Sequence, residues 1–244
     1  RKQASIHKIA KYVKKSYGGP LLKKEIEAIN LVIQNKKKPV TCIIGGSKVS
    51  TKINVIHNLI KNVNNIVIVG AMANNFLAFK GFKVGKSLLE KKSKNIVNAI
   101  YTEAKKYNCN IYIPEDYSVS NSFEGHGNTR KQDSISEDEM ILDIGPKTIN
   151  NIRSIIENSN TVLWNGPAGY FENKNFSLGT LEIAKKISEN TNKKSLISIL
   201  GGGDTISAIN TGKDQFSFTH LSTAGGAFLE YIEGKDLPGL SVLK

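Results

Sequence analysis

The chain has 244 residues, of which 39% are hydrophobic, and 34 basic against 21 acidic residues give it a formal net charge of +13. No apolar run approaches the roughly 18 residues of a membrane-spanning helix, so the composition excludes a transmembrane protein and predicts a soluble globular one with no membrane partner. Almost all of the positive charge is lysine, without the arginines and interleaved aromatic residues that favour base contacts, so we expect solvated lysines and no nucleic-acid partner.

The cysteines and the first residues bear on the compartment and on the completeness of the chain. Cys42 lies in an apolar run and Cys109 flanks another, which predicts buried free thiols in a cytoplasmic protein. The sequence begins at Arg1 rather than at a methionine, and its N-terminal stretch lacks the apolar core of a secretory signal. We therefore expect the chain to be cut from a longer protein.

The first predicted element is an amphipathic helix over residues 20–35, where apolar positions recur at helical spacing behind Pro20. Short apolar runs then alternate with helical patterns. The apolar runs, which we expect to be strands, lie at 40–45, 65–70, 110–114, 161–166, 195–203 and, more weakly, 216–220. The helical patterns lie near 50–62, 71–79, 91–106, 147–157, 175–190, 204–211 and 224–232.

This alternation predicts the fold class. Continuous apolar strands separated by helices are typical of a parallel sheet that is covered on both faces. We therefore predict an α/β domain over roughly 37–232, a doubly wound and mainly parallel six-stranded sheet with helices on both faces, similar to a Rossmann fold. The polar section 115–140 interrupts the alternation, and we expect it to hold a small antiparallel excursion.

Four of the predicted strands end in glycine, in IIGGSK, VIVGAMA, LWNGPAG and SILGGGDT. Ligands of doubly wound sheets bind outside the carboxyl ends of the strands, where glycine lets the backbone come close to a ligand. In GGSKVSTK, Lys48 and Lys52 lie one turn apart at a predicted helix start, where two cations oppose the helix dipole. Because an anion with several charges would reverse that cost, the pair predicts a phosphate site.

The segment LGGGDT is the most informative of the four. Its three glycines leave amide N–H groups uncovered at a helix N-terminus, which is a phosphate-binding arrangement. Asp204 is open to two interpretations. It is either a carboxylate that caps the helix, or an oxygen ligand for Mg²⁺ beside the phosphates, with the hydroxyl of Thr205 on a phosphate oxygen. The spacing alone leaves both interpretations open.

In WNGPAGYFE, Asn165 follows a strand, and Glu172 is either a surface carboxylate or an acceptor for ribose hydroxyls. We expect Trp164 to belong to the core because it completes an apolar strand. The nearest match to a P-loop, GFKVGKS, is one residue short and follows no strong strand, so we reject that motif. The histidines are scattered and show neither a nucleophile constellation nor metal-ligand spacing.

Six motifs of the chain resemble those of the phosphoglycerate kinase family in their order and spacing. They are GGSKVSTK, VGKSLLE, LDIGPKT, LWNGPAGYFE, GGGDT and STAGGAFLEYIEGKDLPG. The resemblance covers nearly the whole chain and matches roughly the C-terminal half of the family's length. It implies a glycolytic enzyme, usually monomeric, that transfers a phosphoryl group between 1,3-bisphosphoglycerate and Mg-ADP, giving 3-phosphoglycerate and Mg-ATP.

The resemblance also implies a division of the chain and a set of site residues. The parts are 1–19 as the end of the N-terminal lobe with its linker, 20–36 as the interdomain hinge helix, 37–232 as the nucleotide-binding domain, and 233–244 as a segment returning toward the absent lobe. By resemblance, Lys48 and Lys52 are the catalytic residues on the phosphates, and Asp204 binds Mg²⁺ with the nucleotide. The other matches are Gly46, Gly202, Gly203 and Thr205 at the phosphates, Asn165 and Pro167 beside phosphates and sugar, Glu172 at the ribose, Gly70 and Ala71 at the adenine, and Arg1 at the phosphoglycerate.

Departures from the family pattern concern the ligand pockets. Ala71 and Ile141 stand where the family commonly has glycine, and both would narrow the base pocket. Ala224 replaces a glycine at a helix start whose N–H groups serve the transferring phosphate. The family's phosphoglycerate-binding basic patch and catalytic arginine lie in the absent lobe, so we expect this chain to bind Mg-ADP or Mg-ATP with negligible turnover alone. The alternative is a stand-alone nucleotide-binding module without catalysis.

Overall fold

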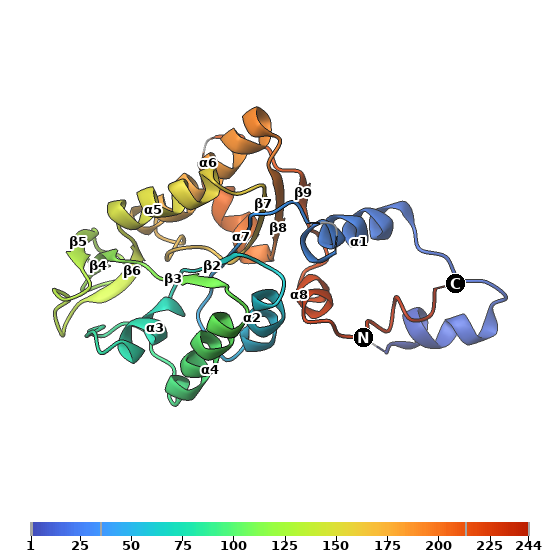
Figure 1. The fold of residues 1–244 in the computed structure, drawn as a ribbon, viewed down its shortest axis with the longest axis horizontal. Coiled ribbons are helices and arrows are strands. Elements are labelled where there is room, and N and C mark those ends of the chain that lie inside the picture. The colour runs from blue at the N-terminus through green and yellow to red at the C-terminus, as the bar shows by residue number, and fades with distance from the viewer. Residues whose placement is uncertain (1, 35, 213, 244) are drawn as a thin grey trace.

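The computed structural model describes residues 2–34, 36–212 and 214–243 (Figure 1). Its α-helices are α1 Pro20–Ile33, α2 Ile53–Ile60, α3 Ala73–Phe79, α4 Ser93–Lys106, α5 Pro146–Glu157, α6 Leu178–Lys194, α7 Gly203–Ile209 and α8 Gly226–Ile232. Short π- or 3-10-helical segments lie at Ala4–Lys8, Ile9–Tyr12 and Lys174–Phe176. Its strands are β1 Val40–Ile44, β2 Asn65–Ile68, β3 Asn110–Tyr112, β4 Asp116–Ser120, β5 Asn128–Lys131, β6 Met140–Ile144, β7 Thr161–Asn165, β8 Ile197–Gly201 and β9 His220–Leu221. None of the helices in these ranges has the length and hydropathy of a bilayer-spanning segment.

Within the described ranges, six of the strands form one parallel sheet in the order β3-β2-β1-β7-β8-β9. The chain builds one half of the sheet outward from β1 and then returns to begin the other half at β7. This is the strand order of doubly wound nucleotide-binding folds, so the predicted fold class is confirmed. The reversal places the carboxyl ends of β1 and β7 side by side, which is where such sheets form their ligand crevice.

Helices cover both faces of the large sheet (Figure 1). In β1, Cys42 and Ile44 point into an apolar cluster with α1, α2, α3, α4 and α8, whereas Ile43 points into a second cluster with α5, α6 and α7. Side chains alternate between the two clusters because successive residues of a strand point to opposite faces of the sheet. Since both faces are covered, every residue of β1 is buried. Cys42 and Cys109 are buried free thiols, as the sequence predicted.

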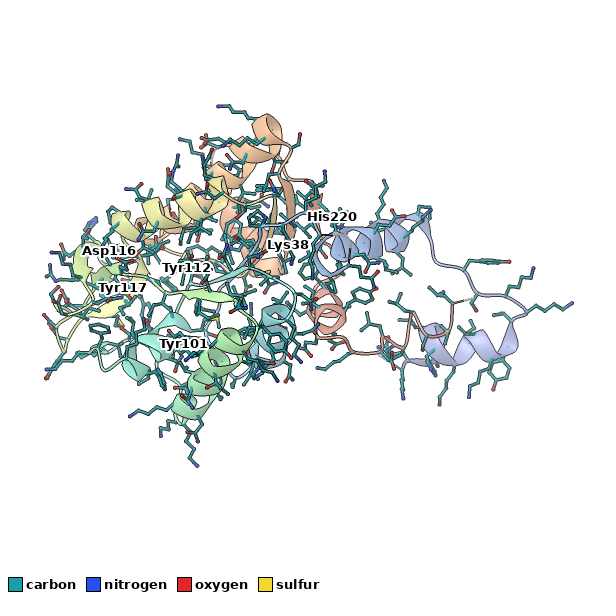
Figure 2. The ribbon with its side chains drawn as sticks, viewed as in Figure 1. Lys38, Tyr101, Tyr112, Asp116, Tyr117 and His220 are labelled. Carbon is teal, nitrogen blue, oxygen red and sulfur yellow. The ribbon has the colours of Figure 1, made fainter. Side chains whose placement is uncertain are left out.

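The polar section 115–140 contributes two strands to a small antiparallel sheet, in the order β5-β4-β6, which confirms the expected excursion. Asp116 and Tyr117 lie in this sheet, at the end of the molecule far from the chain termini (Figure 2). The carboxylate of Asp116 accepts from the N–H of Thr148 at 2.7 Å and from the N–H of Lys147 at 2.9 Å. Asp116 therefore ties the small sheet to the first turn of α5.

The segments 2–19 and 233–243 lie beside each other and away from the sheets (Figure 1). A Cβ placed on Gly18 would lie 3.3 Å from the side chain of Leu243, and one placed on Gly239 would lie 3.4 Å from Ile6. Apolar side chains are exposed there, and Tyr12 is 87% exposed. The N-terminal and C-terminal segments thus form a projection with an uncovered apolar surface.

Most boundaries shift by a few residues from the expectation, and two differences bear on the argument. The run 216–220 enters the sheet only at its last residue, because β9 is His220–Leu221. Phe216 and Phe218 instead pack against the second apolar cluster. In addition, α7 has Gly202 at its N-cap. Asp204 therefore lies inside the first helical turn and is not the cap residue.

Candidate functional site

The loops after β1 and β7 meet backbone to backbone. The N–H of Gly45 donates to the carbonyl of Asn165 at 2.8 Å. A Cβ on Gly166 would lie 2.3 Å from the carbonyl oxygen of Gly45, and Gly166 has a φ of +104°. Only glycine accepts both this contact and this dihedral angle without strain. The glycines after these two strands therefore close the space between the loops as well as turning the chain.

Lys52 lies over this junction. Its Nζ donates to the carbonyl oxygen of Asn165 at 3.3 Å and to Oδ1 of the same residue. Both acceptors are neutral. Burial lowers the pKa of Lys52 to about 8, although the charge of Asp204 raises it. An ammonium group that is largely desolvated and held by neutral oxygens favours an anionic ligand, which would restore the lost solvation.

Thr205 joins the loop after β7 to the loop after β8. Its hydroxyl donates to the carbonyl of Gly201 at 3.0 Å and accepts from the N–H of Gly166 at 2.7 Å. The side-chain amide of Asn165 donates to the same Gly201 carbonyl at 2.7 Å. Thr205 is fully buried. Its hydroxyl therefore holds the two loops together. The prediction from the sequence was that this hydroxyl contacts a phosphate oxygen instead.

A cavity of about 540 Å³ opens at this edge of the sheet. Several of the residues predicted for the site line it together, namely Gly46, Gly70, Ala71, Pro167, Glu172 and Asp204. They follow β1, β2, β7 and β8 in the chain. The four glycine-ended strands thus converge on one cavity, as their sequences predicted.

Part of the cavity wall is aromatic. Phe123 and Tyr170 line it with ring centroids 5.0 Å apart and ring planes inclined at 57°. The side-chain amide of Asn173 donates to the carbonyl of Phe123 at 2.8 Å, which fixes the loop after β4 against the loop after β7. Ile141 lines the same region. Such a surface binds a flat apolar group. The sequence analysis named Ile141 but not Phe123 or Tyr170, because no sequence motif around these two aromatic residues indicates a ligand site.

Asp143 is a buried carboxylate in the cavity wall, only 2% exposed. It accepts hydrogen bonds from the N–H of Ile144 and the N–H of Gly179, both at 2.8 Å. Burial raises the pKa of Asp143 to about 7, although these two hydrogen bonds lower it. Its only sequence signal is its place in the motif LDIGP, and it was not among the predicted site residues.

The remaining predicted residues lie around the cavity or beyond the described residues. Lys48 is exposed on the loop between β1 and α2. A Cβ on Gly202 would lie 2.8 Å from the side-chain amide nitrogen of Asn165, whereas one on Gly203 would meet open space. Gly202 therefore packs against the Asn165 side chain under Lys52. Arg1 lies outside the residues that the structure describes.

Comparison with known proteins relates the chain to one family. The family model described as phosphoglycerate kinase matches residues 1–235. The phosphoglycerate kinase of Wolbachia pipientis wMel is 43% identical over 246 residues, which cover 100% of this chain and 62% of the relative. The phosphoglycerate kinase of Chelativorans sp. (strain BNC1) is 42% identical over 231 residues, which cover 94% of this chain and 58% of the relative.

Solved structures give the same result. The structure of phosphoglycerate kinase from Coxiella burnetii matches with a TM-score of 0.92 at 37% identity, covering 100% of this chain and 63% of that one. The phosphoglycerate kinase from Pyrococcus horikoshii OT3 matches with a TM-score of 0.82 at 30% identity, covering 100% and 60%. The chain therefore spans only 58–63% of the length of these relatives. From the family model, the sequence identity and the shared fold together, the chain belongs to the phosphoglycerate kinase family.

Proposed function

We propose that the cavity is the nucleotide site of a phosphoglycerate kinase, in which a phosphoryl group passes between 1,3-bisphosphoglycerate and Mg-ADP to give 3-phosphoglycerate and Mg-ATP. The observation that carries this proposal is Lys52, whose largely desolvated ammonium group is held over the junction of β1 and β7 by two neutral oxygens of Asn165. The charge of Asp204 offsets this desolvation only in part, because the pKa of Lys52 is still lowered, and a polyphosphate would supply further negative charge. Phosphoryl transfer depends on positioning and charge rather than on a protein nucleophile, which agrees with this site.

Two parts of the cavity wall suit the two ends of a nucleotide. The phosphates would lie near Gly46 and Asp204, beside Lys52, with Lys48 on the same loop as a second cation. The base would lie against Phe123 and Tyr170, because flat apolar groups pack well on aromatic rings. Glu172 is exposed and lines the cavity. Its carboxylate is the acceptor we propose for the ribose hydroxyls.

Asp204 fits the role of a Mg²⁺ ligand. Its carboxylate is exposed, lines the cavity and does not cap α7. Mg²⁺ is usually held by one or two carboxylates and completes its octahedron with water and substrate phosphates. Among the described residues, no three or more His, Cys, Asp or Glu side chains gather at one metal position. A cation at Asp204 would therefore depend on the nucleotide for further ligands, and it would offset the charge of the phosphates.

We propose that phosphoglycerate binds with the help of Arg1 and of the part of the family's length that this chain does not span. The adjacency of the two terminal segments and the exposure of Tyr12 support a role for residues 1–19 and 233–244 as the contact surface for that part. In this proposal α1, within residues 20–36, is the hinge between the two lobes. Turnover by the 244 residues alone would then be negligible.

Calorimetric titration with ADP, with and without Mg²⁺, tests the nucleotide site. We expect Mg²⁺ to strengthen binding, Asp204→Ala to remove that gain, and Lys52→Met to weaken binding by about tenfold or more, since a charge-assisted contact is lost. Lys83→Met is the matched control because Lys83 is exposed and pairs only with Glu137 among the described contacts. Equal affinities of Lys52→Met and the unaltered chain would refute the proposal.

A coupled assay separates the enzyme from a nucleotide-binding module. The 244-residue chain alone should show negligible turnover, and addition of the N-terminal lobe of a phosphoglycerate kinase as a separate polypeptide should restore it. Full turnover by the chain alone would contradict the requirement for a second lobe. Mg-ADP binding without any restored turnover would favour the module.

A further inference from the structure

Glu90 connects the lysine-bearing loop to the body of the protein. It lies between α3 and α4, 40 residues along the chain from Ser50. Its carboxylate accepts a hydrogen bond from the N–H of Ser50 at 3.1 Å and another from the hydroxyl of the same residue. Ser50 stands midway between Lys48 and Lys52 in the sequence. Glu90 therefore holds the part of the loop from which both proposed phosphate ligands extend.

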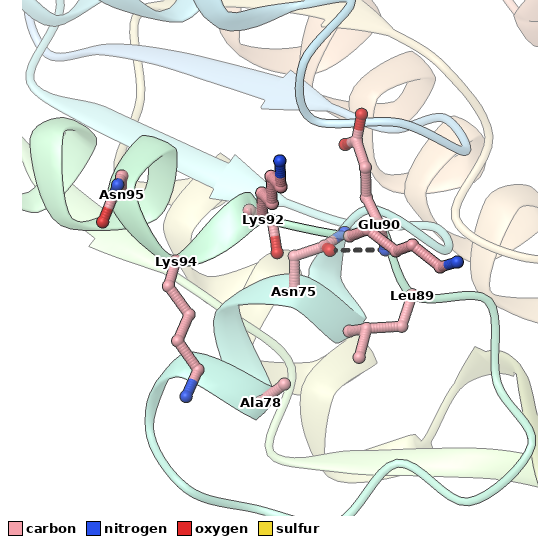
Figure 3. Close-up of a pocket in the computed structure, with 9 residues that line it drawn as sticks. Asn75, Ala78, Leu89, Glu90, Lys92, Lys94 and Asn95 are labelled. Atoms are coloured by element: carbon pink, nitrogen blue, oxygen red, sulfur yellow. Dashed lines mark hydrogen bonds between the residues drawn. The ribbon is translucent and has the colours of Figure 1, made fainter.

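Helix α3 in turn holds Glu90. The side-chain oxygen of Asn75, a residue only 1% exposed, accepts from the N–H of Glu90 at 2.9 Å (Figure 3). The neighbouring Asn74, which is fully buried, donates to the carbonyl of Leu88 at 3.0 Å. Two buried side chains of one helix thus fix the backbone of the segment 88–90. The carboxylate reaches Ser50 from an anchored position.

The N–H of Ser50 lies two residues before the N-cap of α2, Lys52, and Glu90 supplies its acceptor. Burial raises the pKa of Glu90. The hydrogen bonds from Ser50 and Val49 and the charge of Lys48 together lower it by more than burial raises it, so the net shift of the pKa is downward. Glu90 is therefore ionised at neutral pH. An ionised carboxylate that accepts backbone N–H bonds is among the stronger hydrogen-bonding groups in proteins.

We propose that Glu90 is a positioning residue of the phosphate site, which holds the loop 46–52 so that Lys48 and Lys52 face the bound nucleotide. This inference rests on the proposed function of the cavity. The negative charge of Glu90 repels a phosphate ligand through space, whereas its hydrogen bonds favour binding by ordering the loop. The two effects have opposite signs, and a substitution that removes only one of them separates them.

The test compares Glu90→Ala with Glu90→Gln in calorimetric titrations of the 244-residue chain with Mg-ADP. Glutamine keeps an acceptor oxygen for Ser50 and removes the charge, whereas alanine removes both. We expect Glu90→Ala to bind about tenfold more weakly than the unaltered chain, and Glu90→Gln to bind at least as tightly as the unaltered chain. Glu137→Ala, which removes an exposed carboxylate paired with Lys83, should leave the affinity unchanged. If Glu90→Ala binds as tightly as Glu90→Gln, the positioning role is overturned.

Hydrogen exchange without nucleotide distinguishes failure of this inference from failure of the proposed function. In Glu90→Ala the amides of residues 49–52 should exchange faster, with Ser50→Ala intermediate, while the melting temperature stays within about 2 °C. Unchanged exchange in this loop overturns the inference. If the unaltered chain binds no Mg-ADP and the loop amides of Glu90→Ala still exchange faster, the proposed function fails while the hold of Glu90 on the loop stands.

Discussion

The Nζ of Lys52 lies 3.3 Å from the carbonyl oxygen of Asn165, across the point where the strand order of the sheet reverses. The two residues are 113 positions apart in the chain. Because Asn165 is the last residue of β7 and is buried, the charge of Lys52 is located by the sheet itself rather than by a mobile loop. Groups supported by regular elements are held more closely than groups on loops.

From this contact we expect the affinity for Mg-ADP to fall as the pH rises from about 7 to about 9.5. Burial lowers the pKa of Lys52 to about 8 in the free protein, and a bound phosphate would raise it. The contribution of the charged lysine to binding is therefore complete below about pH 8 and is lost above it. Nucleotide phosphates are already ionised above pH 7, so their own titration adds little.

Calorimetric titrations across this pH range measure the effect, and Lys52→Met provides the comparison. The variant should bind weakly with an affinity that changes little over the range. An equal decline in the variant and in the unaltered chain would assign the pH dependence to another group.

Asp143 should make the folded chain less stable as the pH rises toward neutrality. Burial raises the pKa of Asp143 from 3.8 to about 7. Between these values the folded state keeps a proton that the unfolded state has released. The free energy of unfolding therefore falls with rising pH, by at most about 1.4 kcal/mol per pH unit from this group. Urea denaturation at several pH values between about 4.5 and 8 measures the slope.

Asp143→Asn identifies the group responsible. An amide can accept from only one of the two N–H groups of Ile144 and Gly179, so we expect a loss of about 1–3 kcal/mol at low pH. This loss should shrink as the pH rises, because the unaltered chain loses stability while its folded state keeps the proton that its unfolded state has released. A gap that stays constant with pH would contradict this account of Asp143.

Substitution of Gly166 should be far more damaging than substitution of Gly203, although both lie beside the site. A Cβ on Gly166 would meet the Gly45 carbonyl at 2.3 Å at a φ of +104°, whereas one on Gly203 would meet nothing within 4 Å. We expect Gly166→Ala to cost about 2–5 kcal/mol from backbone strain and overpacking. Gly203→Ala should stay within about 0.5 kcal/mol. Chemical denaturation of both variants tests the contrast, and similar losses would contradict it.

Glu25 should couple α1 to the loop that precedes α8. Its buried carboxylate accepts from the N–H of Thr223 at 2.7 Å and from Nε2 of His220 at 3.1 Å. His220 lies next to α1 (Figure 2). Glu25→Ala should destabilise the chain by about 1–3 kcal/mol and speed amide exchange at residues 222–226.

Glu27→Ala serves as the control for Glu25. Glu27 lies on the same helix but is exposed, and its only described ion pair is with Lys23 at 3.8 Å. Surface pairs of this kind contribute little, so the variant should match the unaltered chain to within about 0.5 kcal/mol. Equal losses in the two variants would show that α1 itself, rather than the Glu25 contact, is sensitive to substitution.

The large sheet could be predicted because its strands are buried on both faces and so appear as unbroken apolar runs before glycine. This is why the ends of β1, β2, β7 and β8 could be expected at one site. The run 216–220 was predicted as a strand because its two aromatic residues have high strand propensity. Strand formation also requires hydrogen bonds to a neighbouring strand, and within this region His220 and Leu221 are the residues that pair with β8.

Other features of the site could not be predicted because they depend on contacts between residues distant in the chain. Nothing near Glu90 in the sequence indicates that its carboxylate reaches Ser50. Thr205 has the sequence context of a phosphate ligand, but the N–H of Gly166 and the carbonyl of Gly201 occupy its hydroxyl. The Mg²⁺ role of Asp204 stays a prediction that the titration of Asp204→Ala would test, and the ribose role of Glu172 stays a prediction.

The contact between Gly45 and Gly166 also determines where this site can diverge in evolution. There the backbones themselves are in contact, so a side chain on either glycine would have to move a strand end. Elsewhere the cavity wall consists of side chains such as Phe123, Ile141 and Tyr170, which can change size one at a time without moving a strand. Changes in the cavity wall should therefore accumulate at these side chains sooner than at Gly45 and Gly166.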